Sequence, residues 1–222
     1  MAYIDDLLDP APLRLETGLS RLESGALVVA VRTDLHGCKG RMLDWWFKQF
    51  DTDQHLNWWH PLDHVAHHGW DQHWRKGKSY VGATIRAVEA LGDIPPVPAI
   101  IKFHQPTEIF AEEAYRQAIA NQDVSTVVYA RIGFGAAVAL DANGDPTDGQ
   151  MVHVVRDTSY GAVLRSRFIL GQNAGATGHP LPDAIGFGLL QHCHTEFRYL
   201  SKLLPSLYWG DQANRDEVPL LW

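Results

Sequence analysis

Hydrophobic and polar residues alternate with a period of two in several segments of the chain. In residues 79–91 the alternate positions Val81, Ala83, Ile85, Ala87 and Glu89 share one face, which predicts a strand. Residues 24–35, 99–110, 125–135 and 149–171 are rich in β-branched and aromatic residues, with turn signals between them. These segments predict an antiparallel sheet, with residues 141–149 as a hairpin loop.

A helical period replaces this alternation near both ends of the chain. Residues 39–50 have apolar side chains at a spacing of three and four, and so does a longer segment at roughly 183–204. We expect the second helix to end near Pro205. Its apolar stripe comprises Leu189, Leu190, Cys193, Phe197, Leu200 and Leu204. Helices first, strands in the middle and a long helix last predict an α+β fold.

Three segments give weaker signals. Residues 55–74 resemble a loop broken by Pro61 and followed by one or two helical turns. The proline-rich residues 92–99 resemble a connector, and residues 112–123 fit either a short helix or an exposed strand. We expect one domain over residues 1–222, in which residues 1–38 form an N-terminal segment with the early strand and residues 39–205 form the core.

The composition excludes several classes of protein. The chain has 222 residues, 45% of them hydrophobic, and no run of 18 apolar residues, so no membrane span is expected. Its net charge is −7 and its basic residues are dispersed, which argues against a nucleic-acid partner. Two cysteines cannot form a disulfide framework, and the N-terminus lacks the pattern of a secretory signal. A cytoplasmic location is therefore expected.

Histidine is the unusual component, because the chain contains twelve. Six of them fall in one stretch of nineteen residues that is also rich in tryptophan: His55, His60, His64, His67, His68 and His73. Near the other end, His192 and Glu196 are four residues apart in the predicted helix, so they lie on one face. A surface ion pair is the common interpretation of such a pair. The same spacing also lets both side chains bind one cation, if other segments complete the site.

Two segments offer further ligands. The histidine-rich segment is one, and its tryptophans would reduce the access of water to a metal. Glu89 is the other, because a carboxylate on the apolar face of a strand is costly unless it is paired or metal-bound. The alternative is that Glu89 lies in water at the end of its strand.

The order of these motifs resembles a known family. "MLDWWF", "WWHPLDH", "YVGATIRAVEAL", "HVVRDTSYGAVLRSRFILG" and "HCHTE" follow one another as in the 2,4-diacetylphloroglucinol hydrolase and phloretin hydrolase family, over about residues 40–205. The resemblance implies a metal-dependent hydrolase that cleaves a carbon–carbon bond between an acyl group and a phenolic ring. It also implies a helix-grip fold, similar to Bet v 1 and START domains, in which a curved antiparallel sheet surrounds a long C-terminal helix.

The resemblance further implies a metal site of two histidines and two glutamates. The matching positions are His64, Glu89, His192 and Glu196, with His60 as the competing choice for the first ligand. One Zn²⁺ ion is expected in each chain. Fe²⁺ and Mn²⁺ remain alternatives, because spacing does not identify the metal.

The expected substrate is a small aromatic ketone or a diketone. Cleavage of its carbon–carbon bond requires a proton donor, for which His153 is the first candidate and His55, His67 and His68 are others. Trp59 is a candidate contact for an aromatic substrate. Phe168 occupies the late-strand position where the family places a hydroxyl-bearing residue, so we expect substrates with fewer free hydroxyl groups. Arg167 could anchor a phenolate or a carboxylate, but a solvent-facing, ion-paired face is the alternative.

A carrier of hydrophobic ligands is the main alternative function, since helix-grip folds commonly enclose such ligands and fold alone does not define function. A bound metal distinguishes the two, because a carrier does not need the ligand cluster. A metal-dependent oxygen enzyme is a second alternative. A homodimer is the default expectation for a small enzyme.

Overall fold

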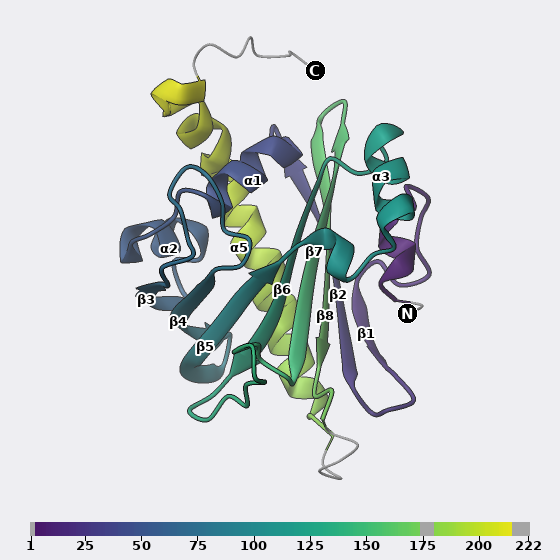
Figure 1. Cartoon of the computed structure of the whole chain (residues 1–222), viewed down its shortest axis with the longest axis vertical. Coiled ribbons are helices and arrows are strands. Elements are labelled where there is room, and N and C mark those ends of the chain that lie inside the picture. Colours follow the sequence, from purple (N-terminus) through teal and green to yellow (C-terminus); the bar gives the residue numbers. More distant parts are fainter. Residues whose placement is uncertain (1–2, 174–179, 215–222) are drawn as a thin grey trace.

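The computed structural model describes residues 3–173 and 180–214 (Figure 1). All strands in these residues belong to one antiparallel sheet of eight, in the order β1-β2-β8-β7-β6-β5-β4-β3. The strands are β1 (Gly18–Arg21), β2 (Leu27–His36), β3 (His64–Trp70), β4 (Thr84–Leu91), β5 (Ile94–His104), β6 (Thr126–Phe134), β7 (Gly149–Thr158) and β8 (Gly161–Leu170). The helices are α1 (Gly40–Phe47), α2 (Asp53–Trp59), α3 (Glu112–Ala120) and α5 (Asp183–Gly210), with 3-10 turns η1 (Asp5–Leu8), η2 (Pro106–Glu108) and η3 (Gln212–Asn214).

The long helix α5 crosses the inner face of the sheet (Figure 1). It contacts β1 and β2 at one end of the strand order and β4 near the other end. Two glycines allow this close approach. A Cβ atom on Gly186 would lie 2.9 Å from the Leu27 side chain, and one on Gly188 would lie 2.8 Å from the Leu91 carbonyl oxygen. The sheet therefore holds α5 from both sides, which confirms the predicted helix-grip fold.

The sheet is covered on both faces. The inner core lies between the sheet, α5, α1 and α2, and includes Trp46, Phe47, Phe103 and Phe197. The outer core lies under α3 and the N-terminal segment, and includes Leu7, Phe110 and Ile169. Because both faces are covered, all ten residues of β8 are buried.

The segment 55–74 differs from the prediction, since its helix precedes Pro61 and a strand follows it. Helix α2 begins after Thr52, whose hydroxyl oxygen accepts a hydrogen bond from the His55 backbone N–H over 3.2 Å. Such a threonine cap starts a helix at a definite position. Strand β3 then runs from His64 to Trp70, with register irregularities on each side of Ala66 and His67.

The prediction of a connector over residues 92–99 was also wrong, because β5 begins at Ile94. Proline is tolerated there for a definite reason. The pairing of β5 with β6 starts only at Ala99, so the proline residues lie where β5 is paired on one side alone. The turn before them contains Gly92, whose φ of +62° suits glycine.

Helix α5 continues through Pro205 to Gly210, beyond the predicted end. Proline has no N–H to donate to the carbonyl of Ser201, four residues earlier. The Cys38 thiol donates to this carbonyl instead, with an Sγ–O distance of 3.5 Å. Residues 112–120 adopt the helical alternative, as α3. Within the described residues, no helix has both the length and the apolar character needed to cross a membrane.

Candidate metal centre and substrate pocket

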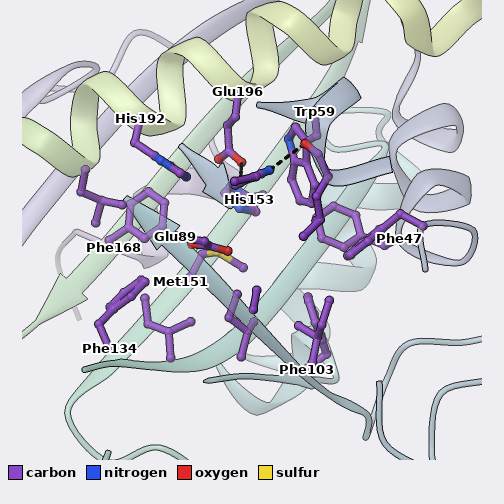
Figure 2. Close-up of a pocket in the computed structure, with 18 residues that line it drawn as sticks. Phe47, Trp59, Glu89, Phe103, Phe134, Met151, His153, Phe168, His192 and Glu196 are labelled. Carbon is purple, nitrogen blue, oxygen red and sulfur yellow. Dashed lines mark hydrogen bonds and ion pairs between the residues drawn. The ribbon is translucent and has the colours of Figure 1, made fainter. Parts of the chain in front are cut away.

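Four buried side chains from three elements converge on the inner face of the sheet (Figure 2). His192 and Glu196 lie one turn apart on α5, whereas His64 and Glu89 are directly paired across β3 and β4. One potential ligand atom each of His64, Glu89 and His192 lies within 4.8 Å of the others. Glu196 joins them, since its Oε2 lies 3.6 Å from His64 Nε2. The four residues predicted from the sequence as metal ligands are therefore brought together.

Hydrogen bonds orient both imidazole rings of this group. The Nδ1 atom of His64 lies 3.1 Å from the Leu56 carbonyl oxygen, and the Nδ1 atom of His192 lies 3.1 Å from Asp63 Oδ2. A carbonyl oxygen and a carboxylate only accept, so each Nδ1 carries the proton and donates it. In the neutral form of each ring the Nε2 atom then keeps its lone pair, as a metal ligand requires.

Asp63 is the functional candidate that the sequence analysis missed, although it belongs to the same "HPLDH" motif. It is 7% exposed and also accepts a hydrogen bond from the Gly92 backbone N–H over 3.0 Å. The hydrogen bond from His192 is the main reason why the pKa of Asp63 is lowered to about 2. Asp63 is therefore charged at neutral pH and holds His192 in one tautomer.

His60 lies beside this group, and its role differs from that of His64. Its Nδ1 atom accepts hydrogen bonds from the backbone N–H groups of Asp63, over 3.0 Å, and Leu62, over 3.3 Å. Its Nε2 atom lies 3.4 Å from Asp63 Oδ2. His60, Asp63 and His192 thus form a second buried group with ligand spacing, which shares His192 with the first.

The electrostatics of the first group suit a cation. Burial raises the pKa of Glu89, and it raises the pKa of Glu196 to about 8. Burial, followed by the charge of His192, lowers the pKa of His64 well below its usual range, so His64 is neutral at neutral pH. Burial alone would lower the pKa of His192, but the hydrogen bond to Asp63 and the charges of Glu196 and Glu89 together raise it.

Ionising two buried carboxyl groups with no adjacent Lys or Arg is costly, and a divalent cation would offset that cost. No Lys or Arg is present among the described residues that line this pocket. The donor set of two imidazole nitrogens and two carboxylates is one that zinc and similar divalent metals accept. The residues present therefore fit a metal ion.

These side chains form one wall of a pocket between the sheet and α5, which we call the inner pocket (Figure 2). The rest of its lining is apolar except for His153. The apolar residues are Phe47, Phe50, Leu56, Trp59, Ile85, Ala87, Ile101, Phe103, Ile132, Phe134, Met151, Phe168 and Leu189. Two predicted substrate contacts, Trp59 and Phe168, thus line the pocket.

His153 is the one predicted proton-transfer histidine that lines the inner pocket. It is 1% exposed, and its Nδ1 atom lies 2.7 Å from the Ser166 hydroxyl oxygen. Its ring packs against Phe197 and Phe168, with centroid distances of 4.9 and 5.8 Å. Burial lowers the pKa of His153 to about 3, so this residue is neutral at neutral pH.

The other three candidates, His55, His67 and His68, lie outside the described residues that line the inner pocket. The Nδ1 atom of His55 accepts from the Asp51 backbone N–H over 3.1 Å, and His68 is exposed. The backbone of His67 donates to Asp53, and its ring packs against Phe50. These histidines are close to His64 in sequence but not in space, because α2 and the irregular strand β3 direct neighbouring side chains differently.

Arg167 likewise lies outside the lining of the inner pocket, on the outer face of β8. Its Nε atom donates to the Tyr3 carbonyl oxygen over 3.1 Å, and its Nη2 atom donates to the Leu15 carbonyl oxygen over 3.0 Å. Arg165 on the same face forms an ion pair with Glu16 at 2.7 Å. The two arginines therefore hold the N-terminal segment against the sheet. The expected alternative, a solvent-facing and ion-paired face, agrees with the structure in its ion pair but not in its exposure, because both arginines are buried.

Fold and site together define a helix-grip protein with a buried histidine–carboxylate group in the wall of an apolar pocket. The family model described as the DAPG hydrolase PhiG domain matches residues 1–209, and the chain belongs to that family. The match includes the N-terminal segment, which the sequence resemblance had left out. The chain is 25% identical to phloretin hydrolase of Eubacterium ramulus over 210 residues, covering 86% of this chain and 70% of that protein.

Several solved structures share parts of the fold at low identity. Protein NE0264 from Nitrosomonas europaea has a TM-score of 0.48 and 12% identity, covering 84% of this chain and 98% of its own. Ara h 8.0201 has a TM-score of 0.47 and 13% identity, covering 81% of this chain and 99% of its own. Similarity at this level carries no information about activity or site.

Proposed function

We propose that this protein is a zinc-dependent hydrolase that cleaves a carbon–carbon bond next to a carbonyl, in an acylated phenol or a β-diketone-like compound. The observation that carries the proposal is the convergence of His64, Glu89, His192 and Glu196 at the wall of an apolar pocket. Membership of the DAPG hydrolase PhiG domain family and the similarity to phloretin hydrolase support the choice of reaction.

The proposed ligands are the Nε2 atoms of His64 and His192 and the carboxylates of Glu89 and Glu196. Zinc is the first choice for two imidazoles with carboxylates, and Fe²⁺ or Mn²⁺ are the alternatives. When bound, the metal supplies a Lewis acid that polarises the carbonyl oxygen of the substrate. Asp63 would keep His192 in the required tautomer, through the hydrogen bond at 3.1 Å.

His153 is the proposed proton carrier. In the hydrolysis, a water oxygen bonds to the carbonyl carbon, the bond from that carbon to the ring breaks, and the ring carbon takes up a proton. Because its pKa is lowered to about 3 by burial, His153 begins the reaction neutral. It would therefore first accept the proton of the water and then transfer it to the ring carbon. For Nε2 to accept this proton, Nδ1 must carry the ring hydrogen and donate it to the Ser166 hydroxyl oxygen, 2.7 Å away.

The lining of the inner pocket supports a substrate with few hydroxyl groups. None of the described lining residues carries a hydroxyl group, and Phe168 lies beside His153. A substrate hydroxyl buried without a partner costs roughly 1–3 kcal/mol. Acylphenols with one hydroxyl group next to the ketone, or alicyclic β-diketones, are therefore better candidates than phloroglucinols with several free hydroxyls.

The test combines metal analysis with a substrate panel. Untagged protein, purified without added metal, should contain about one zinc ion per chain by elemental analysis. The metal-loaded protein should convert at least one acylphenol or β-diketone to a carboxylic acid and its deacylated partner in equal amounts, by mass spectrometry. Glu196→Gln should abolish this conversion. If no compound is cleaved, the hydrolase proposal is wrong.

A carrier of hydrophobic ligands is the second candidate, favoured by the apolar lining of the pocket. A carrier would bind several panel compounds equally well with and without metal, and would cleave none. A hydrolase would bind a reactive β-diketone more tightly when metal is present, because a divalent cation would attract its carbonyl oxygens.

A further inference from the structure

A second cavity, which we call the outer pocket, lies next to the inner pocket. It is lined by Leu91, Ile94, Val97, Ile132, Gly133, Phe134, Gly135, Asp148, Gly149, Leu170, Leu181 and Ile185. Ile132 and Phe134 belong to both pockets. The outer pocket is also the larger, with a cavity volume of about 240 Å³ against about 50 Å³ for the inner pocket.

The two pockets lie at successive levels between the sheet and α5. On β4 the lining passes from Glu89 in the inner pocket to Leu91 in the outer one, two residues further along the strand and past a register irregularity. On β8 it passes from Phe168 to Leu170, also two residues further along the strand.

Helix α5 shows the same relationship. Its lining residues Leu189 and Ile185 are four residues apart, which is one turn on one face of the helix. A ligand at the histidine–carboxylate group thus has the outer pocket as its next neighbour, towards the N-terminal end of α5.

The outer pocket is apolar and offers little to a charged group. Asp148 is its one charged lining residue among those described, and the Asp148 Oδ1 atom already accepts from the Asn173 backbone N–H over 3.1 Å. A carboxylate on the ligand would be repelled there. An uncharged hydrocarbon chain would bury apolar surface against Leu91, Leu170 and Ile185.

We propose that the outer pocket is a specificity-determining subsite for an uncharged apolar arm of the substrate, namely the alkyl part of an acyl group longer than acetyl. This inference rests on the proposed function, because the arm belongs to a substrate whose carbonyl lies at the histidine–carboxylate group. The protein would therefore favour long-chain acyl β-diketones over their acetyl counterparts.

The test is a binding titration, so it does not depend on turnover. A series of 2-acylcyclohexane-1,3-diones with acyl chains of increasing length is titrated calorimetrically into the metal-loaded protein. We expect Kd to fall about three- to fourfold for each added methylene until the outer pocket is filled. A chain that ends in a carboxylate should bind no better than the acetyl compound.

Ile185→Trp fills the outer pocket and should remove the dependence on chain length, while the acetyl compound binds as in the wild type. Leu181→Trp, on the segment before α5, gives the same test if the first variant folds poorly. Phe187→Trp is the matched control, because Phe187 is 61% exposed on the same helical turn and lines neither pocket. The control should keep the chain-length dependence.

The inference is overturned if Kd does not change with chain length in the wild type. It is also overturned if both tryptophan variants keep the dependence, or if the carboxylate-ended chain binds as tightly as the methyl-ended one. A series that binds as expected but is never cleaved would support the subsite and remove the proposed hydrolase function, so the two failures are distinguishable.

Discussion

The Nδ1 atom of His192 donates a hydrogen bond to the Oδ2 atom of Asp63 over 3.1 Å, between two buried residues that are 129 positions apart in the sequence. This contact joins the C-terminal helix to the segment that precedes β3. Replacing Asp63 by asparagine removes the charge of the side chain but keeps its shape, and so tests the role of this hydrogen bond. Asp63→Asn should weaken zinc binding about 10- to 100-fold, measured by competition with a chelator.

The control for this variant is Asp93→Asn, in the exposed turn next to Gly92, which should leave zinc affinity unchanged. An unchanged affinity in Asp63→Asn would show that His192 does not need this partner. Thermal unfolding of the zinc-loaded and metal-free proteins separates the effects, because a purely structural role would lower both melting temperatures equally.

A second prediction separates the two candidate histidines of "HPLDH". His64→Ala should remove most of the zinc, since the His64 Nε2 atom faces Glu196 at 3.6 Å. His60→Ala should retain it, since His60 contacts the backbone and Asp63. Elemental analysis after dialysis measures both variants. The reverse pattern would transfer the ligand role to His60, and loss in both would indicate that the whole segment is required.

A third prediction concerns the cost of the buried carboxylates. The pKa of Glu196 is raised by burial to about 8, so its contribution to stability is fully present below its unfolded pKa of about 4.5 and is lost as pH rises through 8. Glu196→Gln cannot titrate, so at pH 8 the metal-free variant should be more stable than the metal-free wild type, by roughly 1–4 kcal/mol. Urea unfolding at pH 5 and pH 8 measures the difference.

Zinc should reverse this order, because the wild type gains stability on binding and the variant has lost a ligand. Equal stability of the two metal-free proteins at pH 8 would mean that Glu196 carries no uncompensated charge.

A fourth prediction concerns His153. Its pKa is lowered by burial to about 3, so the stability it contributes is present above its unfolded pKa of about 6.5 and is lost as pH falls towards 3. His153→Gln should flatten the fall in stability between pH 6.5 and 3, followed by urea unfolding. The same variant should lower kcat about 10²- to 10⁴-fold with unchanged zinc content. A kcat close to that of the wild type would remove His153 from the reaction.

A fifth prediction tests the role of Arg167. Arg167→Ala should destabilise the protein by roughly 1–3 kcal/mol, because the carbonyl groups of Tyr3 and Leu15 lose their donors. It should leave KM unchanged, since Arg167 lies on the outer face of the sheet. Arg198→Ala, at an exposed position on α5, is the control and should change neither quantity. A marked rise in KM for Arg167→Ala would restore the arginine as a substrate contact.

By itself, the sequence determined the relationships that a local period sets. The helical period places His192 and Glu196 one turn apart, and the strand period places Glu89 on the same face as Ile85 and Ala87. Both relationships depend on a few neighbouring residues, so they hold in any fold that keeps the element. The family resemblance then selected His64 from a segment whose own pattern was ambiguous.

Tertiary structure decided everything that depends on which element lies beside which. His64 lies opposite Glu89 because of the register of β3 against β4, and Asp63 lies behind His192 because α5 crosses the sheet at that point. Alternation places Arg165 and Arg167 on one face of their strand, but β8 is buried on both faces, so its pattern could not say which face is the inner one. Which side chains are buried, and which residues they contact, depends on how elements distant in sequence pack together, and no local period encodes this.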